Sequence, residues 1–224
     1  MRRLVIGDIH GNFEALKRVV ANAKLDPVKD RVFCLGDVVD GPAGRDVYAC
    51  IEWLTTLKHL KMILGNHDWW ALQHFEARDI NPQYEYAPWV WTTQGGDTTI
   101  ASYHKHRQDG LMPMKHIKLF KRAKLYHITK DGVVFVHGGF PYNGSPAMTD
   151  DETLMWDRKL ISDVKNKGPT SVYKHIFVGH STTQMFKSVA PLTFGNLTMM
   201  DTGAGWDGKL SIMDVDTHDI WQDR

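Results

Sequence analysis

The sequence predicts an α/β fold in which short parallel strands alternate with helices. Apolar runs at 4–6, 31–35 and 62–64 each end in polar residues, and a segment with helical spacing follows each of them. Helices are expected over 13–24, 45–58 and 69–78, and Asn12 is a suitable cap for the first. This pattern brings the carboxyl ends of neighbouring strands to one sheet edge, where open α/β sheets place their sites.

The second half of the chain has a different character. Residues 81–124 carry many aromatic, histidine and basic residues without strand alternation, which predicts a mostly helical insertion or cap. Strands are expected at 133–136 and 175–178, and two more at 197–203 and 209–215 are expected to be antiparallel. Because no linker, internal repeat or low-complexity stretch interrupts the chain, we expect a single domain over 1–224.

The composition is that of an ordinary globular protein, with 42% hydrophobic and 24% charged residues. The net charge of +1 gives no basic field for stable binding to nucleic acid or an anionic membrane. No apolar run approaches the ~20 residues that span a bilayer, and residues 1–8 are interpreted as the first strand rather than a signal peptide. Cys34 and Cys50 lie in apolar stretches of the sequence, so both are expected to be thiols in the core. Free thiols rather than disulfides are typical of a reducing compartment, so a cytoplasmic location is expected.

Polar residues that suit a metal site stand at the ends of five predicted strands. They are Asp8 and His10, Asp37 and Asp40, Asn66 and His67, His137, and His180. Equal intervals, each the length of one β-α-β repeat, separate the first three groups. One such motif alone is usually a turn, since glycine supplies a positive φ and aspartate caps a helix. Five at strand ends instead predict a metal site.

The side chains in this set also indicate which metals they would bind. Oxygen and imidazole ligands without thiolates suit Mn, Fe, Zn or Ni rather than a structural zinc. A shared carboxylate can hold two cations about 3.5–4 Å apart, where they act together on a phosphoryl group. We therefore expect two divalent ions, Mn²⁺ first, with Fe, Zn, Ni or Mg as alternatives.

Five sequence blocks resemble the signature blocks of calcineurin-like metallophosphoesterases. They are Gly-Asp-Ile-His-Gly-Asn (7–12), Gly-Asp-Val-Val-Asp-Gly (36–41), Gly-Asn-His-Asp (65–68), Val-His-Gly-Gly (136–139) and Gly-His-Ser (179–181). Within that family, the blocks resemble the phosphoprotein phosphatase branch in particular. This branch includes small bacterial and phage serine/threonine phosphatases and the symmetrical diadenosine tetraphosphatases. It runs from about residue 4 to 214, and blocks 156–158 and 201–210 also match small bacterial members. It implies a four-layer α/β/β/α sandwich.

The resemblance also implies a role for each matching residue. The metal ligands would be Asp8 and His10 for one ion, Asp37 as the bridge, and Asn66, His137 and His180 for the other. His67 would be the general acid, oriented by Asp40. Arg158 and Asn66 would bind the substrate phosphate. Water activated between the two ions would then hydrolyse a phosphomonoester.

Two departures from the family pattern bear on the substrate. Protein phosphatases of the family usually have Arg where this chain has Gly41 and Leu64, although Arg158 matches a third phosphate-binding Arg. Arg45 is a candidate to bind the phosphate oxygens in place of the missing arginines. The run Leu-Gly-Asn-His-Asp at 64–68 is similar to the corresponding run in the tetraphosphatases.

We expect a serine/threonine protein phosphatase. The alternatives are a symmetrical diadenosine tetraphosphate hydrolase, a broad phosphomono- or phosphodiesterase, and a catalytically silent binding module. The last is disfavoured because every expected ligand and the proton donor are present.

Several other features have more than one interpretation. The aromatic residues Trp69, Trp70, Tyr84, Tyr86, Trp89 and Trp91 either pack or stack against substrate, and packing is commoner. Four histidines in or next to the predicted insertion, at 104, 106, 116 and 127, are expected at the surface. Asp68 is expected to cap the helix that follows it, and residues 94–96 and 201–203 are expected to form turns. The basic stretch 115–124 is expected to be a solvated face.

Overall fold

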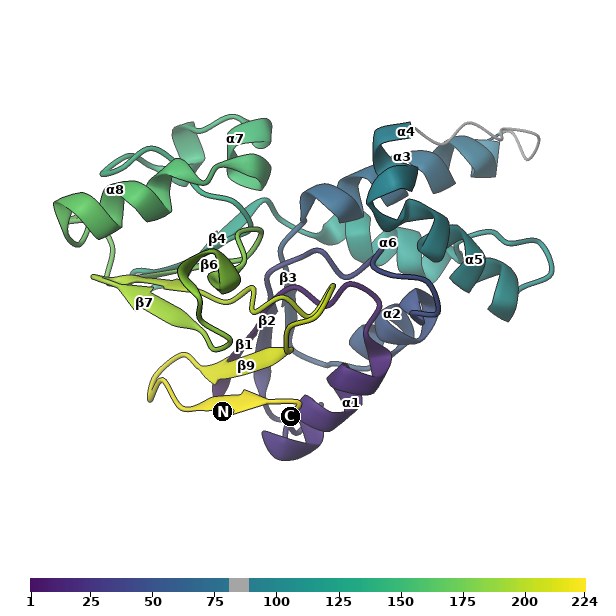
Figure 1. Cartoon of the computed structure of the whole chain (residues 1–224), viewed down its shortest axis with the longest axis horizontal. Coiled ribbons are helices and arrows are strands. Elements are labelled where there is room, and N and C mark those ends of the chain that lie inside the picture. Colours follow the sequence, from purple (N-terminus) through teal and green to yellow (C-terminus); the bar gives the residue numbers. More distant parts are fainter. Residues whose placement is uncertain (81–88) are drawn as a thin grey trace.

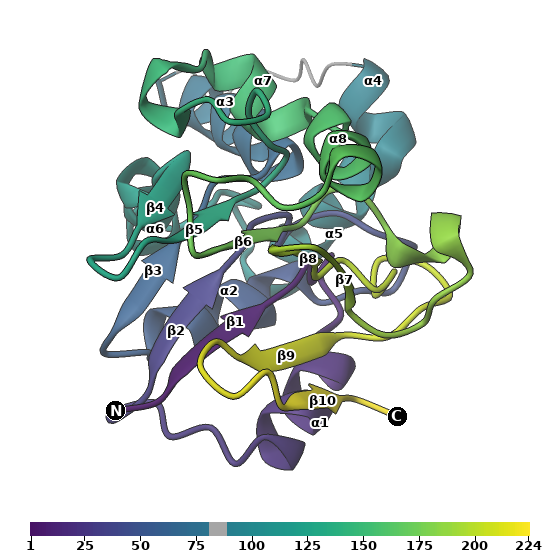
Figure 2. The same cartoon turned by 90° about the vertical axis from the view of Figure 1, so that its left-hand side faces the viewer.

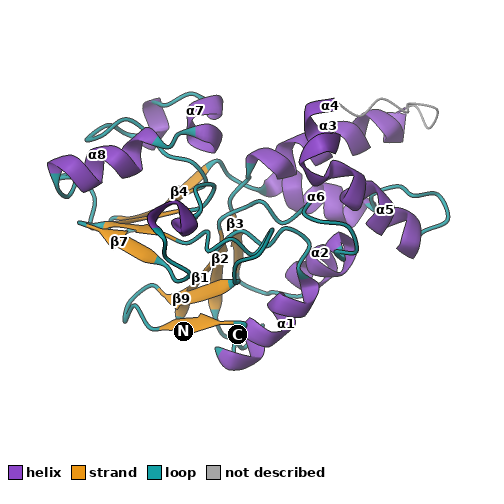
Figure 3. Ribbon diagram, viewed as in Figure 1, coloured by secondary structure: helices purple, strands orange, loops and turns teal. Residues whose placement is uncertain are grey.

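The computed structural model describes residues 1–80 and 89–224 and contains two five-stranded sheets. Figure 1 shows the sheets packed face to face, with helices on the outer side of each. Figure 3, coloured by secondary structure, shows the strands at the centre of this arrangement and the helices at its two sides. The layers are therefore α/β/β/α, and the predicted four-layer fold is confirmed.

The first sheet has the strand order β10-β9-β1-β2-β3. Its strands are β1 (Arg3–Ile6), β2 (Arg31–Cys34), β3 (Leu60–Met62), β9 (Ser211–Asp214) and β10 (Ile220–Gln222). β1, β2 and β3 are parallel, as the repeat predicts, while β9 is antiparallel to β1 and β10. β3 ends two residues before the predicted position because Ile63 bridges to Lys124 and the chain then enters a helix at Asn66.

The second sheet has the order β4-β5-β6-β8-β7. Its strands are β4 (Tyr126–Ile128), β5 (Val133–Val136), β6 (His175–Val178), β7 (Leu192–Phe194) and β8 (Leu197–Met199). The expected antiparallel pairing of 197–203 with 209–215 is wrong, because β8 pairs with β6 and β7 whereas β9 pairs with β1 and β10. Every residue of β8 and β9 is buried, so each strand lies inside its own sheet and the loop between them crosses from one sheet to the other.

Three clusters of buried apolar residues fill the three spaces between the layers. Leu4 and Ile6 of β1 belong to the cluster shared with the helices beside the first sheet, whereas Val5 belongs to the cluster between the sheets. In the space between the sheets, the rings of Phe33 and Phe135 stack with centroids 3.8 Å apart. Side chains of successive residues point to opposite faces of a strand, so both faces of β1 are covered and its sequence is continuously apolar.

Helices cover the outer face of each sheet, and Figure 2 shows the same layers after a quarter turn. The helices of the first layer are α1 (Phe13–Asn22), α2 (Val47–Thr55), α3 (Asn66–Ile80), α5 (Asp97–His106) and α6 (Met114–Arg122). The second sheet is covered by α7 (Asp151–Trp156) and α8 (Lys159–Lys167), which the sequence did not predict. Asn12 caps α1 by accepting the Ala15 N–H, as predicted. α3 begins three residues earlier than expected, so Asn66 and His67 lie in its first turn.

The predicted insertion is mostly helical over its described part, 89–124. It contains α4 (Trp89–Trp91), a π-helical turn (Thr92–Gly96), α5 and α6, and α5 and α6 contact α2 and α3. Residues 81–88, with Tyr84 and Tyr86, lie outside the described residues. The insertion thus extends the helical layer of the first sheet.

One of the four histidines expected at the surface is in the core. His104 and His106 are exposed, but His116 is fully buried beside Ile117 on the inner face of α6. Its Nδ1 lies 2.9 Å from the Tyr103 hydroxyl and its Nε2 lies 2.9 Å from a Glu52 carboxylate oxygen. Because both ring nitrogens have partners, the polar ring is buried without leaving an unsatisfied group.

Both cysteines are buried, as predicted, and burial raises the pKa of each thiol. Such thiols are unreactive, since the thiolate is the reactive form. Among the described residues, the helices are too short or too polar to cross a membrane.

Candidate metal centre

The carboxyl ends of strands from both sheets bring the predicted ligands together. Asp8 follows β1, Asp37 follows β2, His137 follows β5 and His180 follows β6. The first three are buried and His180 is half-buried. Hydrogen bonds join the segments, because the His180 backbone N–H donates to Asp8 Oδ2 at 2.9 Å and the His67 N–H donates to Asp37 Oδ1 at 3.0 Å.

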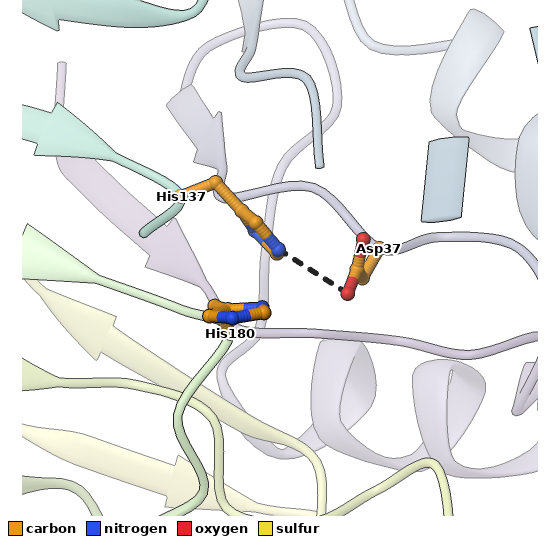
Figure 4. Close-up of side chains that lie close together, drawn as sticks. All are labelled: Asp37, His137 and His180. Carbon is orange, nitrogen blue, oxygen red and sulfur yellow. Dashed lines mark ion pairs between the residues drawn. The ribbon is translucent and has the colours of Figure 1, made fainter. Parts of the chain in front are cut away.

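The cluster contains two groups of ligand atoms that share Asp37. Asp8, His10 and Asp37 form one group, and Asp37, His137 and His180 form the other, with the atoms of each group within 4.8 Å of one another. Figure 4 shows the second group converging from three different segments. Asn66 lies beside it, with Oδ1 3.0 Å from His137 Nε2. A carboxylate shared in this way suits two neighbouring cations.

Backbone carbonyls orient two of the imidazole rings. His10 Nδ1 lies 3.0 Å from the Val39 carbonyl and His137 Nδ1 lies 2.7 Å from the Leu35 carbonyl. A carbonyl can only accept, so each Nδ1 carries hydrogen and each Nε2 is left facing Asp37 Oδ2, at 3.9 Å and 3.2 Å respectively. Metal-binding histidines are commonly fixed in this way by a partner on the second nitrogen.

Two buried polar atoms of the cluster have no hydrogen-bond partner in the part of the chain that the structure describes. They are Asp8 Oδ1 and His180 Nε2, and each belongs to a different one of the two groups. An unsatisfied buried polar atom is costly and calls for an explanation such as an ion. The donor set therefore fits divalent cations.

The surroundings of the ligands shift their pKa values. Burial lowers the pKa of His10 to about 4 and that of His180 to about 3, so both rings are neutral and offer a lone pair. Burial also raises the pKa of Asp8 well above its usual value. For His137, burial is outweighed by the Asp37 charge and the pKa rises to about 10. A cation at this site would compete with that proton for the nitrogen.

Backbone strain is concentrated at the site. His10, Asp37, Asp40 and His180 have φ values of 47°, 46°, 70° and 58°, and they are four of the eight described non-glycine residues with positive φ. Such residues cost of order 1–3 kcal/mol each and cluster at functional sites. Ordinary turns would place glycine here, so the strain favours a functional interpretation of the strand ends.

A histidine–aspartate pair lies next to the cluster. His67 Nδ1 is 2.6 Å from Asp40 Oδ2, and the fully buried Asp40 also accepts the Thr99 hydroxyl at 2.5 Å and the Trp91 indole N–H at 2.9 Å. Burial lowers the pKa of His67, but the charge of Asp37 and the hydrogen bond to Asp40 outweigh it and raise the pKa to about 8. Trp91 and Thr99 belong to the insertion, and sequence reasoning gave neither of them this role.

A cavity of about 230 Å³ opens on the cluster. It is lined by His10, Asp37, Asn66, His67, Gln94, Trp156, Arg158, His180, Thr182, Asp201, Gly203, Gly205 and Trp206. Arg158 is thus placed at the site, as predicted. Arg45 is not, because it lines a neighbouring pocket and its guanidinium donates to the Ala204 carbonyl at 3.0 Å.

Backbone conformation and a close contact with His10 explain why residue 41 is glycine. Gly41 has a φ of 105°, and a Cβ there would lie 2.7 Å from the His10 carbonyl oxygen. A Cβ on Gly95 would lie 2.5 Å from the Gly41 nitrogen, so the two backbones are in direct contact. Residues 94–96 are not a simple turn but part of the π-helical turn, with non-helical backbone at Gln94 and Gly95. This kink brings Gln94 to the cavity, which the sequence did not reveal.

Two further aspartates lie near the ligands. Asp68 does not precede its helix as expected, because α3 begins at Asn66. From the first turn it accepts the Gly65 N–H at 3.2 Å, at the residue before the helix, and the Val38 N–H at 2.9 Å. Asp201 accepts the Gly203 N–H at 2.9 Å within the predicted turn. Asp201 also lines the cavity, and its carboxylate contributes to the raised pKa of Asp8.

Comparison with known proteins identifies the family. The family model for calcineurin-like phosphoesterases matches residues 1–208. The chain belongs to this family. Its relatives include a phosphatase from Salmonella typhimurium named serine/threonine-protein phosphatase 1, which is 25% identical over 93% of this chain and 89% of its own. Serine/threonine-protein phosphatase 2 of Escherichia coli is 26% identical over 94% of this chain and 91% of its own.

A shorter stretch of the sequence is similar to enzymes that are named for a different substrate. The symmetrical bis(5'-nucleosyl)-tetraphosphatase of Serratia proteamaculans is 39% identical, but over 30% of this chain and 24% of its own. Among solved structures, a metallophosphoesterase from Sphaerobacter thermophilus has a TM-score of 0.57 at 20% identity, over 99% of this phosphoesterase and 87% of its own chain. That likeness confirms the fold. The phosphoesterase is therefore a hydrolase of a family that uses divalent metal ions.

Replacing Trp91 by Phe should destabilise this phosphoesterase. The substitution removes the indole N–H from the buried Asp40 carboxylate, and a hydrogen bond to a charged group contributes about 1.5–3 kcal/mol. Urea unfolding should show that loss, whereas Trp89→Phe, at a site 77% exposed, should change stability by less than about 0.5 kcal/mol. Equal effects of the two variants would contradict the hydrogen bond.

Proposed function

We propose that this phosphoesterase is a serine/threonine protein phosphatase that hydrolyses phosphomonoesters at a pair of divalent cations. The observation that carries the proposal is the pair of ligand groups sharing Asp37, with the His67–Asp40 pair beside them. Such a site provides both charge stabilisation at phosphorus and a proton for the leaving group.

The ligands proposed for the two cations are those that the resemblance implies. They are Asp8, His10 and Asp37 for one ion, and Asp37, Asn66, His137 and His180 for the other. When bound, the cations supply a water of lowered pKa and neutralise charge on the phosphoryl oxygens. Mn²⁺ is the first metal to test, because the oxygen and imidazole ligands suit it.

His67 is proposed as the general acid. Its Nδ1 is held by Asp40, and its ring lies edge-on to that of His10 with centroids 5.1 Å apart. This leaves Nε2 to donate to the departing oxygen of a substrate in the cavity. Asp40 keeps the imidazole in one orientation and favours its protonated form.

Arg158 and Asn66 are proposed to hold the phosphoryl group. Arg158 lines the cavity and forms no ion pair with a carboxylate in the described ranges 1–80 and 89–224. A guanidinium presents paired donors that match two phosphoryl oxygens. Arg45 is left out of this set because its donors face the Ala204 carbonyl.

Protein phosphatase activity is preferred because the relatives of that name match nearly the whole chain. The match to tetraphosphatases, which is shorter but of higher identity, favours a second candidate, a symmetrical dinucleoside tetraphosphate hydrolase. A broad phosphoesterase accepting both substrates is the third. A cytoplasmic location is proposed with each, since buried thiols suit a reducing compartment.

A direct assay separates these candidates. The Mn²⁺-loaded protein is offered a phosphoserine peptide and a dinucleoside tetraphosphate side by side, with a chelator-treated sample as the control. We expect faster turnover of the peptide. A strong preference for the dinucleotide would establish the second candidate, and comparable rates would establish the third.

Replacing Asp37 by Asn should abolish loading of both cations. Asn tolerates the positive φ of residue 37, so the fold is kept while the shared charge is lost. The affinity should fall by more than the roughly 10–100-fold that loss of an outer-shell partner costs. Elemental analysis after dialysis measures the effect, with the exposed Asp97→Asn as the control; full metal content would contradict the shared role.

Replacing His67 by Asn should slow substrates with poor leaving groups. Loss of a general acid typically costs 10²–10⁴-fold, on the order expected for an alkyl phosphate. A nitrophenyl phosphate, whose leaving group needs no proton, should be much less affected. The ratio of the two kcat values is the measurement, and an unchanged ratio would exclude the acid role.

A further inference from the structure

A second cavity, of about 500 Å³, adjoins the metal centre and is mostly apolar. Its walls are Leu64, Trp69, Trp70, Leu125, Met155 and Trp156, with Asp151 and Glu152 at the same cavity. We call it the tryptophan cavity. Trp69 is 39% exposed and Trp156 is 36% exposed, so part of each large ring faces solvent. Apolar surface that is gathered at one cavity and rimmed by polar residues is typical of interaction and ligand-binding sites.

Aromatic contacts connect the tryptophan cavity to the proposed general acid. Trp156 lines both cavities, and its ring lies edge-on to Trp70 and to His180 with centroids 5.2 Å and 5.5 Å apart. Trp70 in turn lies edge-on to His67 at 5.2 Å. The two tryptophans therefore form a common wall between the metal centre and the tryptophan cavity.

The position of the general acid indicates which part of a substrate reaches this cavity. A general acid must lie within hydrogen-bond reach of the oxygen that it protonates. The group attached to that oxygen therefore leaves the metal centre on the side of His67, next to Trp70 and Trp156. In a phosphoprotein, that group is the serine or threonine with its flanking residues.

The charges at the tryptophan cavity favour a cationic partner. Asp151 and Glu152 are exposed, and neither forms an ion pair within the described part of the chain. Their carboxylates would repel the additional phosphates of a dinucleoside polyphosphate and attract a Lys or Arg side chain. An apolar floor with an acidic rim thus complements a peptide that carries an apolar and a basic residue.

We propose that the tryptophan cavity is a peptide-recognition subsite for phosphoproteins that carry an apolar and a basic residue beside the phosphoserine or phosphothreonine. The apolar side chain contacts Trp69 and Trp156, and the basic side chain pairs with Asp151 and Glu152. This inference rests on the proposed protein phosphatase function and adds a sequence preference to it.

The test measures kcat/KM of the Mn²⁺-loaded protein on a set of phosphoserine peptides. At each position flanking the phosphoserine, Leu is compared with Ala and Arg is compared with Gln. At the preferred positions Leu should exceed Ala by on the order of 10–200-fold, the range for an added apolar group in a pocket. Arg should exceed Gln, and that preference should shrink as salt is added.

Two variants assign the preferences to the cavity. Trp69→Ala should bring the Leu-to-Ala ratio close to one, whereas Trp89→Ala, which removes an exposed tryptophan outside the cavity, should keep it. The double variant Asp151→Asn with Glu152→Gln should remove the Arg preference, and the exposed Asp97→Asn should not. Ratios are compared because they do not depend on the fraction of folded, metal-loaded protein.

The outcomes separate this inference from the function on which it rests. Phosphopeptides hydrolysed at rates indifferent to the flanking residues, or preferences that survive in Trp69→Ala, would overturn the subsite and leave the phosphatase function intact. Hydrolysis of a dinucleoside tetraphosphate without any phosphopeptide turnover would overturn the proposed function itself.

Discussion

The Asp37 carboxylate is the point on which the metal centre and both sheets converge. One oxygen accepts the backbone N–H of His67 from α3, and the other lies 3.2 Å from the imidazole of His137 at the end of β5. Residue 65 must be glycine, because a Cβ there would lie 2.1 Å from Asp37 Oδ1. Burying a carboxylate is expensive unless it is paired, and the surrounding imidazoles hold the pKa of Asp37 below its usual value. The two sheets and α3 thus meet at the buried Asp37 carboxylate.

The insertion belongs to this centre rather than being an appendage. Trp91 and Thr99 hold Asp40 from the insertion side while His67 contacts it from α3, so the carboxylate links two segments that are distant in sequence. A side chain at position 41 would meet the His10 carbonyl, and residue 95 must be glycine because its backbone lies against Gly41. Gln94, from the same kink as Gly95, is the insertion residue that lines the cavity.

The strand ends could be predicted from the sequence because the determinants are local. A short apolar run followed by Gly-Asp or Gly-His specifies both the strand and the polar residues that it delivers. Trp91, Thr99 and Gln94 could not be assigned in the same way, since their partners come from tertiary packing of a segment without strand periodicity. The wrong pairing of the last strands has a similar origin, because two fully buried strands give no sign of which sheet each joins. His116 was misplaced because a buried histidine whose two ring nitrogens have partners resembles a surface histidine in sequence.

The wall that Trp70 and Trp156 form separates two cavities of different chemical character. On one side, the wall contacts His67 and His180 and so limits the room for water around the proposed acid. On the other side it presents apolar surface, where the part of a substrate that does not react can bind. Binding energy from such a remote part raises the rate only if it holds the phosphoryl group in the reactive position. Since Trp156 lines both cavities, a peptide side chain bound in the second cavity would, under the proposed function, be held beside the ligand cluster, and recognition of the peptide would also align its phosphate.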